Sequence, residues 1–247
     1  MPGAAPPLAV DARPLNEYNA GVKIMALDTS TEHCSAALWL DGELTSLERH
    51  AGQTHSEILL PMIDRLLGEA EMSLGRLDGI AFGAGPGSFT GLRIGCGVAQ
   101  GLAFGAGLPV LGIGTLLALA QAGGAHAGGL ALCCMDARMG EIYHAAYRRS
   151  TVGWEVVEAP GLCKPALAPV PVEGEWNGYG NAFAVYGDVL RSRYGERLAS
   201  VDAAQSPHAS DIAVLAVPLF ERGLGAAAEH AAPHYIRDKV ALRTDER

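Results

Sequence analysis

The chain has 247 residues, which is enough for one large domain or for two smaller lobes, each with its own core. Hydrophobic residues make up 49% and charged residues 18% of the chain, so the composition is globular and a disordered chain is excluded. The formal net charge is −9 and the basic residues are scattered, which argues against a protein that binds nucleic acid by itself.

Residues 1–22 are rich in Pro and Ala and lack the basic start and apolar centre of a signal peptide. We therefore expect a flexible N-terminal extension. The five cysteines form no C-x-x-C pair, which is typical of reduced thiols in a cytoplasmic protein. The apolar stretch 80–135 is interrupted by Pro86, Pro109 and paired glycines, so its pieces are shorter than the roughly 20 residues of a membrane-spanning helix.

The first half predicts strands and helices in a regular order. A buried strand is expected at 23–28, and the alternating runs 35–40 and 43–48 form a hairpin, because Asp-Gly at 41–42 suits a tight turn. Thr54-x-x-Glu57 is a capping box that opens a helix over 54–70. The remaining elements of this half are a strand at 79–83, a helix at 88–104, a strand at 109–113 and a helix at 115–121.

This order, β-β-β-α-β-α-β-α, predicts an α/β fold in which helices pack on a mixed sheet. We assign residues 23–122 to a first lobe and residues 123–247 to a smaller, less regular second lobe, joined through glycine pairs at 123–129. The second lobe opens with a hairpin of 130–136 and 141–147. Near its end, a helix over 211–221 is expected to be capped by Ser210 or Asp211.

The helices over 54–70 and 88–104 have apolar faces wider than one core contact requires. In the second of them, Gly97, Gly101 and Gly105 recur at a spacing of four and form a bare ridge that lets another backbone approach closely. A large apolar patch on a protein in water usually marks an interface. We therefore expect these two helices to bind a partner as a helical bundle.

Two loops could bind an anion or a cation. Asp28, Thr29 and Ser30 follow a buried strand, where an acid and two hydroxyls can hold Mg²⁺ and phosphates; Asp28 capping a turn is an equally good interpretation. The glycine-rich turn with Gly85 and Gly87 lies between a strand and a helix N-terminus, which suits an anion. It matches neither the Rossmann nor the P-loop pattern, so a structural turn is the alternative.

Several strings of the sequence are specific to one family. LDTSTEHCSAAL (27–38), THSEILLPMID (54–64), AFGAGPGSFTGLRIG (81–95), AQGLAFG (99–105) and DARMGEIYHAAY (136–147) resemble the TsaB family, also called YeaZ, and HAAPHYIRDKVA (230–241) resembles its closing segment. The resemblance implies two lobes of the actin/Hsp70/sugar-kinase type, which is ribonuclease H-like.

The resemblance also implies a function. TsaB proteins pair with their paralogue TsaD, and together with TsaE and TsaC they support the synthesis of threonylcarbamoyladenosine beside the tRNA anticodon. In that scheme TsaD performs the transfer, tRNA is reached only through the complex, and ATP or ADP acts at the level of the complex. This chain would be a scaffold without a cofactor or metal of its own, and a second copy could replace TsaD when TsaD is absent.

The family packs the two helices against the equivalent helices of its partner. We expect the interface to be formed by eight residues of the helices at 54–70 and 88–104: Leu59, Met62, Ile63, Leu66, Arg93, Gly97, Gln100 and Gly101.

TsaD-like proteins hold a metal with His-x-x-x-His on the helix after the third parallel strand. Here Thr115 and Leu119 stand at those positions, and neither can replace imidazole as a ligand. A metallopeptidase, one of two enzyme alternatives, is therefore disfavoured. The other, a nucleotide-dependent kinase or hydrolase, would need phosphate and adenosine loops in the second lobe, and only the glycine-rich stretch 174–187 loosely offers one.

Overall fold

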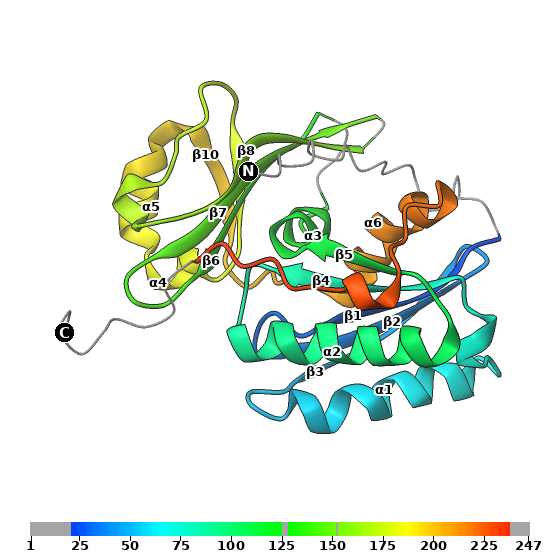
Figure 1. Cartoon of the computed structure of the whole chain (residues 1–247). Coiled ribbons are helices and arrows are strands. Elements are labelled where there is room, and N and C mark those ends of the chain that lie inside the picture. The colour runs from blue at the N-terminus through cyan, green and yellow to red at the C-terminus, as the bar shows by residue number, and fades with distance from the viewer. Residues whose placement is uncertain (1–20, 125–127, 152, 238–247) are drawn as a thin grey trace.

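The computed structural model describes residues 21–124, 128–151 and 153–237. The predicted N-terminal extension, 1–22, lies outside the described residues except for its last two positions. Two five-stranded sheets form the centres of two lobes (Figure 1). Within the described ranges, none of the helices combines the length and the apolar content that crossing a membrane requires.

The first sheet has the strand order β3-β2-β1-β4-β5. Its strands are β1 (Lys23–Asp28), β2 (His33–Leu40), β3 (Glu43–His50), β4 (Gly79–Gly85) and β5 (Val110–Gly114). The first three strands are antiparallel neighbours, and β4 and β5 run parallel to β1. Asp41 and Gly42 have φ angles of 52° and 94°, as a type I′ turn requires, so the predicted hairpin is confirmed.

The second sheet has the order β10-β9-β6-β7-β8. Its strands are β6 (Leu130–Asp136), β7 (Ile142–Ser150), β8 (Gly153–Cys163), β9 (Trp176–Tyr179) and β10 (Leu198–Asp202). The antiparallel pairing of β6 with β7 confirms the second predicted hairpin. At its turn, Arg138, Met139 and Gly140 all have positive φ, which makes this connection unusually tight.

Helices divide the molecule into five layers (Figure 1). The outer face of the first sheet carries α1 (His55–Glu69) and α2 (Phe89–Ala106), while α3 (Thr115–Ala122) and α6 (Ala209–Glu221) lie between the two sheets. The far face of the second sheet carries α4 (Ala182–Val185) and α5 (Gly187–Tyr194). Single 3₁₀ turns complete the fold: η2 (Leu74–Arg76), η3 (Pro165–Leu167), η4 (Gly195–Arg197) and η5 (Ala228–His230).

The lobes share one hydrophobic core. Alternate residues of β1 point to opposite faces, so Ile24 packs toward α3 and α6 whereas Met25 packs toward α1 and α2. The inner core continues from the first sheet through Leu116 and Leu119 of α3 to Ala131 and the other inward residues of the second sheet. A large apolar contact of this kind holds the lobes together.

The closing part of the chain returns to the first lobe. The sequence predicts that all of 123–247 belongs to the second lobe, but α6 packs against β1, β2 and β4 of the first sheet. Most of its apolar residues are buried there, and Ile212 and Leu215 are fully buried. The helical spacing of the apolar residues in α6 predicts an apolar face, but it does not indicate which sheet covers that face.

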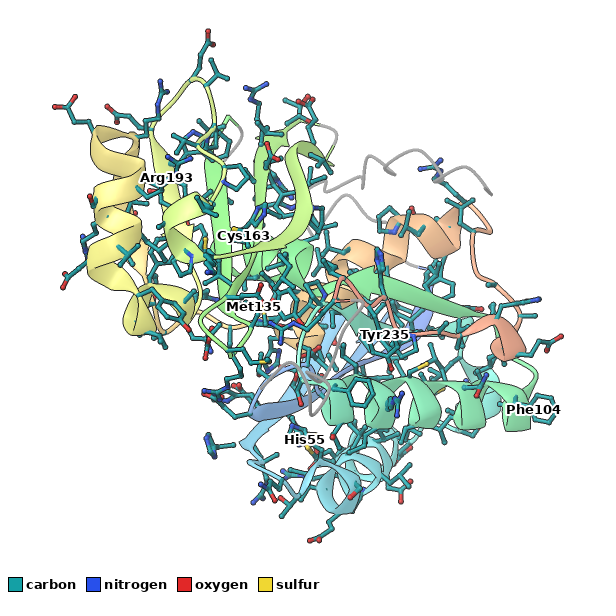
Figure 2. The ribbon with its side chains drawn as sticks, turned by 60° about the vertical axis from the view of Figure 1, so that its left-hand side comes forward. His55, Phe104, Met135, Cys163, Arg193 and Tyr235 are labelled. Atoms are coloured by element: carbon teal, nitrogen blue, oxygen red, sulfur yellow. The ribbon has the colours of Figure 1, made fainter. Side chains whose placement is uncertain are left out.

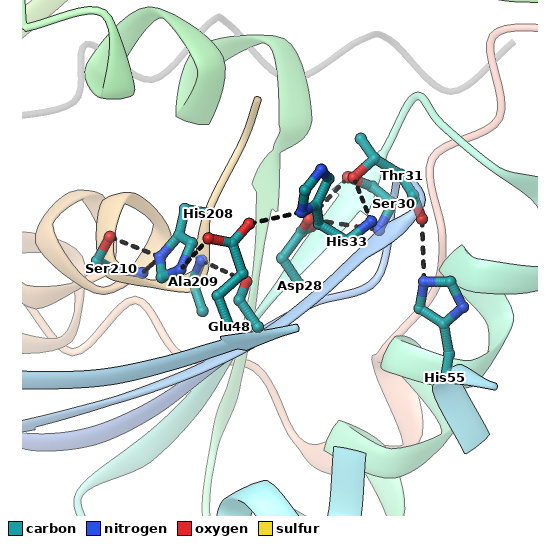
Figure 3. Close-up of polar contacts among 10 residues, drawn as sticks. Asp28, Ser30, Thr31, His33, Glu48, His55, His208, Ala209 and Ser210 are labelled. Carbon is teal, nitrogen blue, oxygen red and sulfur yellow. Dashed lines mark hydrogen bonds and ion pairs between the residues drawn. The ribbon is translucent and has the colours of Figure 1, made fainter. Parts of the chain in front are cut away.

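Both predicted helix caps differ from those observed. The hydroxyl of Thr54 donates to the carbonyl of Ala51 and makes no side-chain cap for α1, so the capping box does not form. The helix α6 is capped by His208, whose Nδ1 accepts from the backbone N–H of Ser210 at 3.1 Å. Glu48 of β3 lies beside His208, with Oε2 at 3.7 Å from Nε2 (Figure 3), and fixes the ring that caps α6.

Candidate functional site

A cleft of about 450 Å³ opens between the ends of the two sheets. Four segments line it: residues 30–32 after β1, residues 86–90 before α2, residues 135–138 at the end of β6, and residues 234–237 near the C-terminus. The carboxyl ends of parallel strands meet here, which is where open α/β sheets bind their ligands.

The structure brings the predicted loop residues together but locks the loops onto each other. Ser88 N–H donates to the carbonyl of Ser30 at 2.7 Å, and the Thr29 hydroxyl donates to the carbonyl of Gly91 at 2.7 Å. A Cβ on Gly87 would lie 2.5 Å from the oxygen of Ser30. This close contact explains why residue 87 is a glycine, and the explanation needs no bound ligand. Phosphate binding by the loop stays a prediction.

Asp28 is sealed inside the first lobe. Its side chain is 1% exposed, its Oδ2 accepts from the Ser30 hydroxyl at 2.9 Å, and its Oδ1 has no hydrogen-bond partner among the residues that the structure describes (Figure 3). Burial raises the pKa of Asp28 to about 7, against the hydrogen bonds from Ser30, and the neighbouring carboxyl of Asp211 raises it further. The alternative that Asp28 fixes a turn is therefore the one that its contacts support. A Mg²⁺ ion at this position is an untested prediction.

The second lobe contributes residues that sequence reasoning did not select. Asp136 ends β6 as Asp28 ends β1, and this parallel was the signal that could have identified it. Its carboxylate accepts from the backbone N–H of Arg138 and from the hydroxyl of Tyr186, and it pairs with the Arg138 guanidinium at 3.1 Å. Asn181 Oδ1 accepts from the Asp136 N–H at 2.8 Å. These contacts hold the β6–β7 turn against the cleft.

The predicted interface residues of α1 point inward. Leu59, Met62, Ile63 and Leu66 are at most 5% exposed, and they pack on β1 and β2 in the core of the first lobe. This corrects their assignment to the partner face, because residues in this core cannot also contact a partner. The outer face of α1 instead carries Leu60, which is 44% exposed, with Pro61 beside it.

The predicted ridge of α2 does face outward. Gly97, Gly101 and Gly105 are exposed, and a Cβ on any of them would have no neighbour within 4 Å. Phe104 on the same helix is 74% exposed and points away from the protein (Figure 2). Arg93 is also exposed, whereas Gln100 is half-buried and donates to the carbonyl of Ala228 in η5.

The helix α3 places the two positions of the absent histidine pair in the shared core. Thr115 is its first residue and Leu119 lies one turn later, and both side chains are fully buried. In the described part of the chain, no group of three His, Cys, Asp or Glu side chains is arranged to hold a metal ion.

Comparisons with known proteins identify the family. Residues 48–244 match the family model of TsaD, tRNA N6-adenosine threonylcarbamoyltransferase. The "tRNA threonylcarbamoyladenosine biosynthesis protein TsaB" of Escherichia coli is 39% identical over 90% of this chain and 97% of its own length. Its counterpart in Haemophilus influenzae is 37% identical over 89% and 95%.

A solved structure, YeaZ from Pseudomonas aeruginosa, superposes with a TM-score of 0.79 at 38% identity, over 87% of this chain and 99% of that one. This match confirms the predicted two-lobed α/β fold. With near-complete relatives of the same name and the same fold, the chain belongs to the TsaB (YeaZ) family.

Proposed function

We propose that the chain is a scaffold subunit in the biosynthesis of threonylcarbamoyladenosine at position 37 of tRNA. It binds TsaD as a heterodimer, TsaE joins this pair, and TsaC is a functional partner in the same pathway. The chain acts in the cytoplasm and reaches tRNA only through the complex. Its membership of the TsaB family supports the pathway.

The observation that carries the partner role is the bare outer face of α2. Three glycines one turn apart leave open space above the helix, and exposed Phe104 extends the same surface. Exposed glycines within a helix each cost up to about 1 kcal/mol relative to alanine, so such a ridge is unfavourable for a helix that remains in water. A facing helix that packs closely on the ridge would offset this cost through van der Waals contact.

A non-catalytic role is supported by the burial of α3. A metal-binding TsaD-like site needs imidazoles there, whereas Thr115 is buried and Leu119 belongs to the apolar core between the sheets. We propose that the chain holds no cofactor of its own and that ATP or ADP acts at the level of the complex.

The test is the affinity of the purified chain for TsaD of the same organism. Gly101→Leu should keep its fold and lose at least tenfold in affinity, since the added side chain fills the approach that the facing helix needs. Gly187→Leu in α5 is the matched control, because a Cβ there also meets open space but lies on the other lobe. An unchanged affinity for folded Gly101→Leu would remove the ridge from the interface.

Two apolar residues of α1, one exposed and one buried, test whether this helix takes part in the interface. Leu60→Glu places a charge on the exposed side of α1, so it should weaken TsaD binding while the melting temperature stays the same. Met62→Glu buries an unpaired charge in the core and should unfold the chain instead. Circular dichroism separates the two effects.

ATP titration of the isolated chain tests the kinase alternative. Saturable binding of ATP would favour that alternative.

A further inference from the structure

A short segment at the end of the described chain crosses the mouth of the cleft. Residues 231–237 follow η5 on the first lobe and run toward β6 and β7 of the second (Figure 1). The residues 234–237 line the cleft that the loops after β1, β4 and β6 also line. Tyr235 lies on the first lobe beside α2 (Figure 2). Residues 234–237 therefore form one wall of this cleft.

The segment is attached to the first lobe near the start of α2. The N–H of His234 donates to the carbonyl of Ala84 at 2.6 Å. The Tyr235 ring lies 5.5 Å from that of Phe89, and its hydroxyl accepts from Nε of Arg93 at 3.0 Å. Gly85 has a φ of 114°, and a Cβ there would stand 2.6 Å from the oxygen of His234. Gly85, predicted to bind phosphate, thus makes room for this segment.

The second attachment is a single arginine. The guanidinium of Arg237 pairs with the Glu141 carboxylate at 2.6 Å and donates to Met139 Sδ at 3.2 Å, both at the β6–β7 turn. Its longer contact, 3.5 Å, is with the carbonyl of Arg138. The Arg237 side chain is only 14% exposed, so this pair is stronger than an ordinary surface ion pair.

Neither attachment is needed to hold the lobes together, because the core around α3 and α6 already joins them. The segment itself buries little apolar surface, and Tyr235 is 41% exposed. Segments with few buried apolar contacts open locally at a free energy far below that of global unfolding. We propose that residues 231–237 are a lid over the interlobe cleft, fixed at η5 and fastened to the second lobe by the Arg237–Glu141 pair.

The lid is tested by the reactivity of a thiol placed under it. Ala137 lines the cleft and is 7% exposed, so Ala137→Cys adds one sulfur there. The parent protein also carries Cys163→Ser, since the other four cysteines are buried. Arg237→Gln and Glu141→Gln should each raise the rate of alkylation by N-ethylmaleimide about tenfold, the factor that corresponds to about 1.4 kcal/mol.

Two further variants separate the lid from a general loss of structure. The charge swap Arg237→Glu with Glu141→Arg should bring the alkylation rate back toward that of the parent. Arg191→Gln, on exposed α5, should leave the rate unchanged. Hydrogen exchange at the His234 amide should accelerate in Arg237→Gln and in Glu141→Gln. Equal rates in parent, Arg237→Gln and Glu141→Gln would overturn the proposal, and so would faster alkylation of the buried cysteines in both.

Discussion

Replacing Asp28 with asparagine should stabilise the protein, and the gain should grow as the pH rises. Burial raises the pKa of Asp28 from 3.8 to about 7 in the folded chain. A group whose folded pKa is raised contributes stability that is fully present below pH 3.8 and is lost as the pH rises through 7. Asparagine stays neutral throughout, and its Oδ1 can still accept from Ser30.

The size of the change in free energy of unfolding follows from the shift in the pKa of Asp28. One pKa unit corresponds to about 1.4 kcal/mol, and between pH 5 and pH 7 the wild type loses stability at that rate per pH unit. The advantage of Asp28→Asn in free energy of unfolding should therefore grow by about 2.7 kcal/mol from pH 5 to pH 8. Asp211, whose pKa burial also raises to about 7, titrates in both proteins and largely cancels in the comparison.

The assay is urea denaturation of both proteins at several pH values, followed by circular dichroism, with exposed Asp64→Asn as control. A constant difference between wild type and Asp28→Asn at all pH values would refute the reasoning, because no proton would then be taken up at this site. Lower stability of the variant at pH 8 would mean that the charged carboxylate has a favourable partner.

Three other outcomes are expected. Gly83→Ala should lower the melting temperature strongly, because its Cβ would overlap Oδ1 of buried Asp28, whereas Gly68→Ala, with open space on α1, should raise it slightly. Elemental analysis of the isolated chain should find no stoichiometric transition metal, and transferase and peptidase assays should find no activity; one tightly held zinc or iron per chain would contradict this. A truncation starting at Lys23 should keep its melting temperature and its affinity for TsaD, and a loss of several degrees would show that residues 1–22 pack on the fold.

The sequence predicted the strands of the first sheet and the β6–β7 hairpin because their signals are local, whereas β8, β9 and β10 were not predicted. The strand at 23–28 has the observed bounds, since an apolar run of six residues suits a buried strand and is too short for a typical helix. The Asp-Gly pair at 41–42 fixed the first hairpin because few other residues accept positive φ at both positions.

Features that depend on distant parts of the chain were not predictable in this way. Leu59 and Leu60 are equally apolar neighbours, and only the position of the sheet makes one fully buried and the other 44% exposed. The return of α6 to the first sheet and the crossing of residues 231–237 are set by tertiary contacts across the molecule. The glycine ridge of α2 was found because its signal, a bare helical stripe, lies within one element.

Burying an acid at the end of β1 lowers the stability of the fold. The question is therefore whether Asp28 has a role in the function or is only a residue inherited with the fold. Its counterpart Asp136 binds the β6–β7 turn with both oxygens, but Oδ1 of Asp28 has no hydrogen-bond partner within the described part of the chain. If the chain acts as a scaffold through α2, Asp28→Asn should support threonylcarbamoyladenosine formation with TsaD at the wild-type level while gaining stability. A folded, TsaD-binding Asp28→Asn variant that cannot support the modification would show that the carboxylate takes part in the reaction, and the non-catalytic role would have to be abandoned.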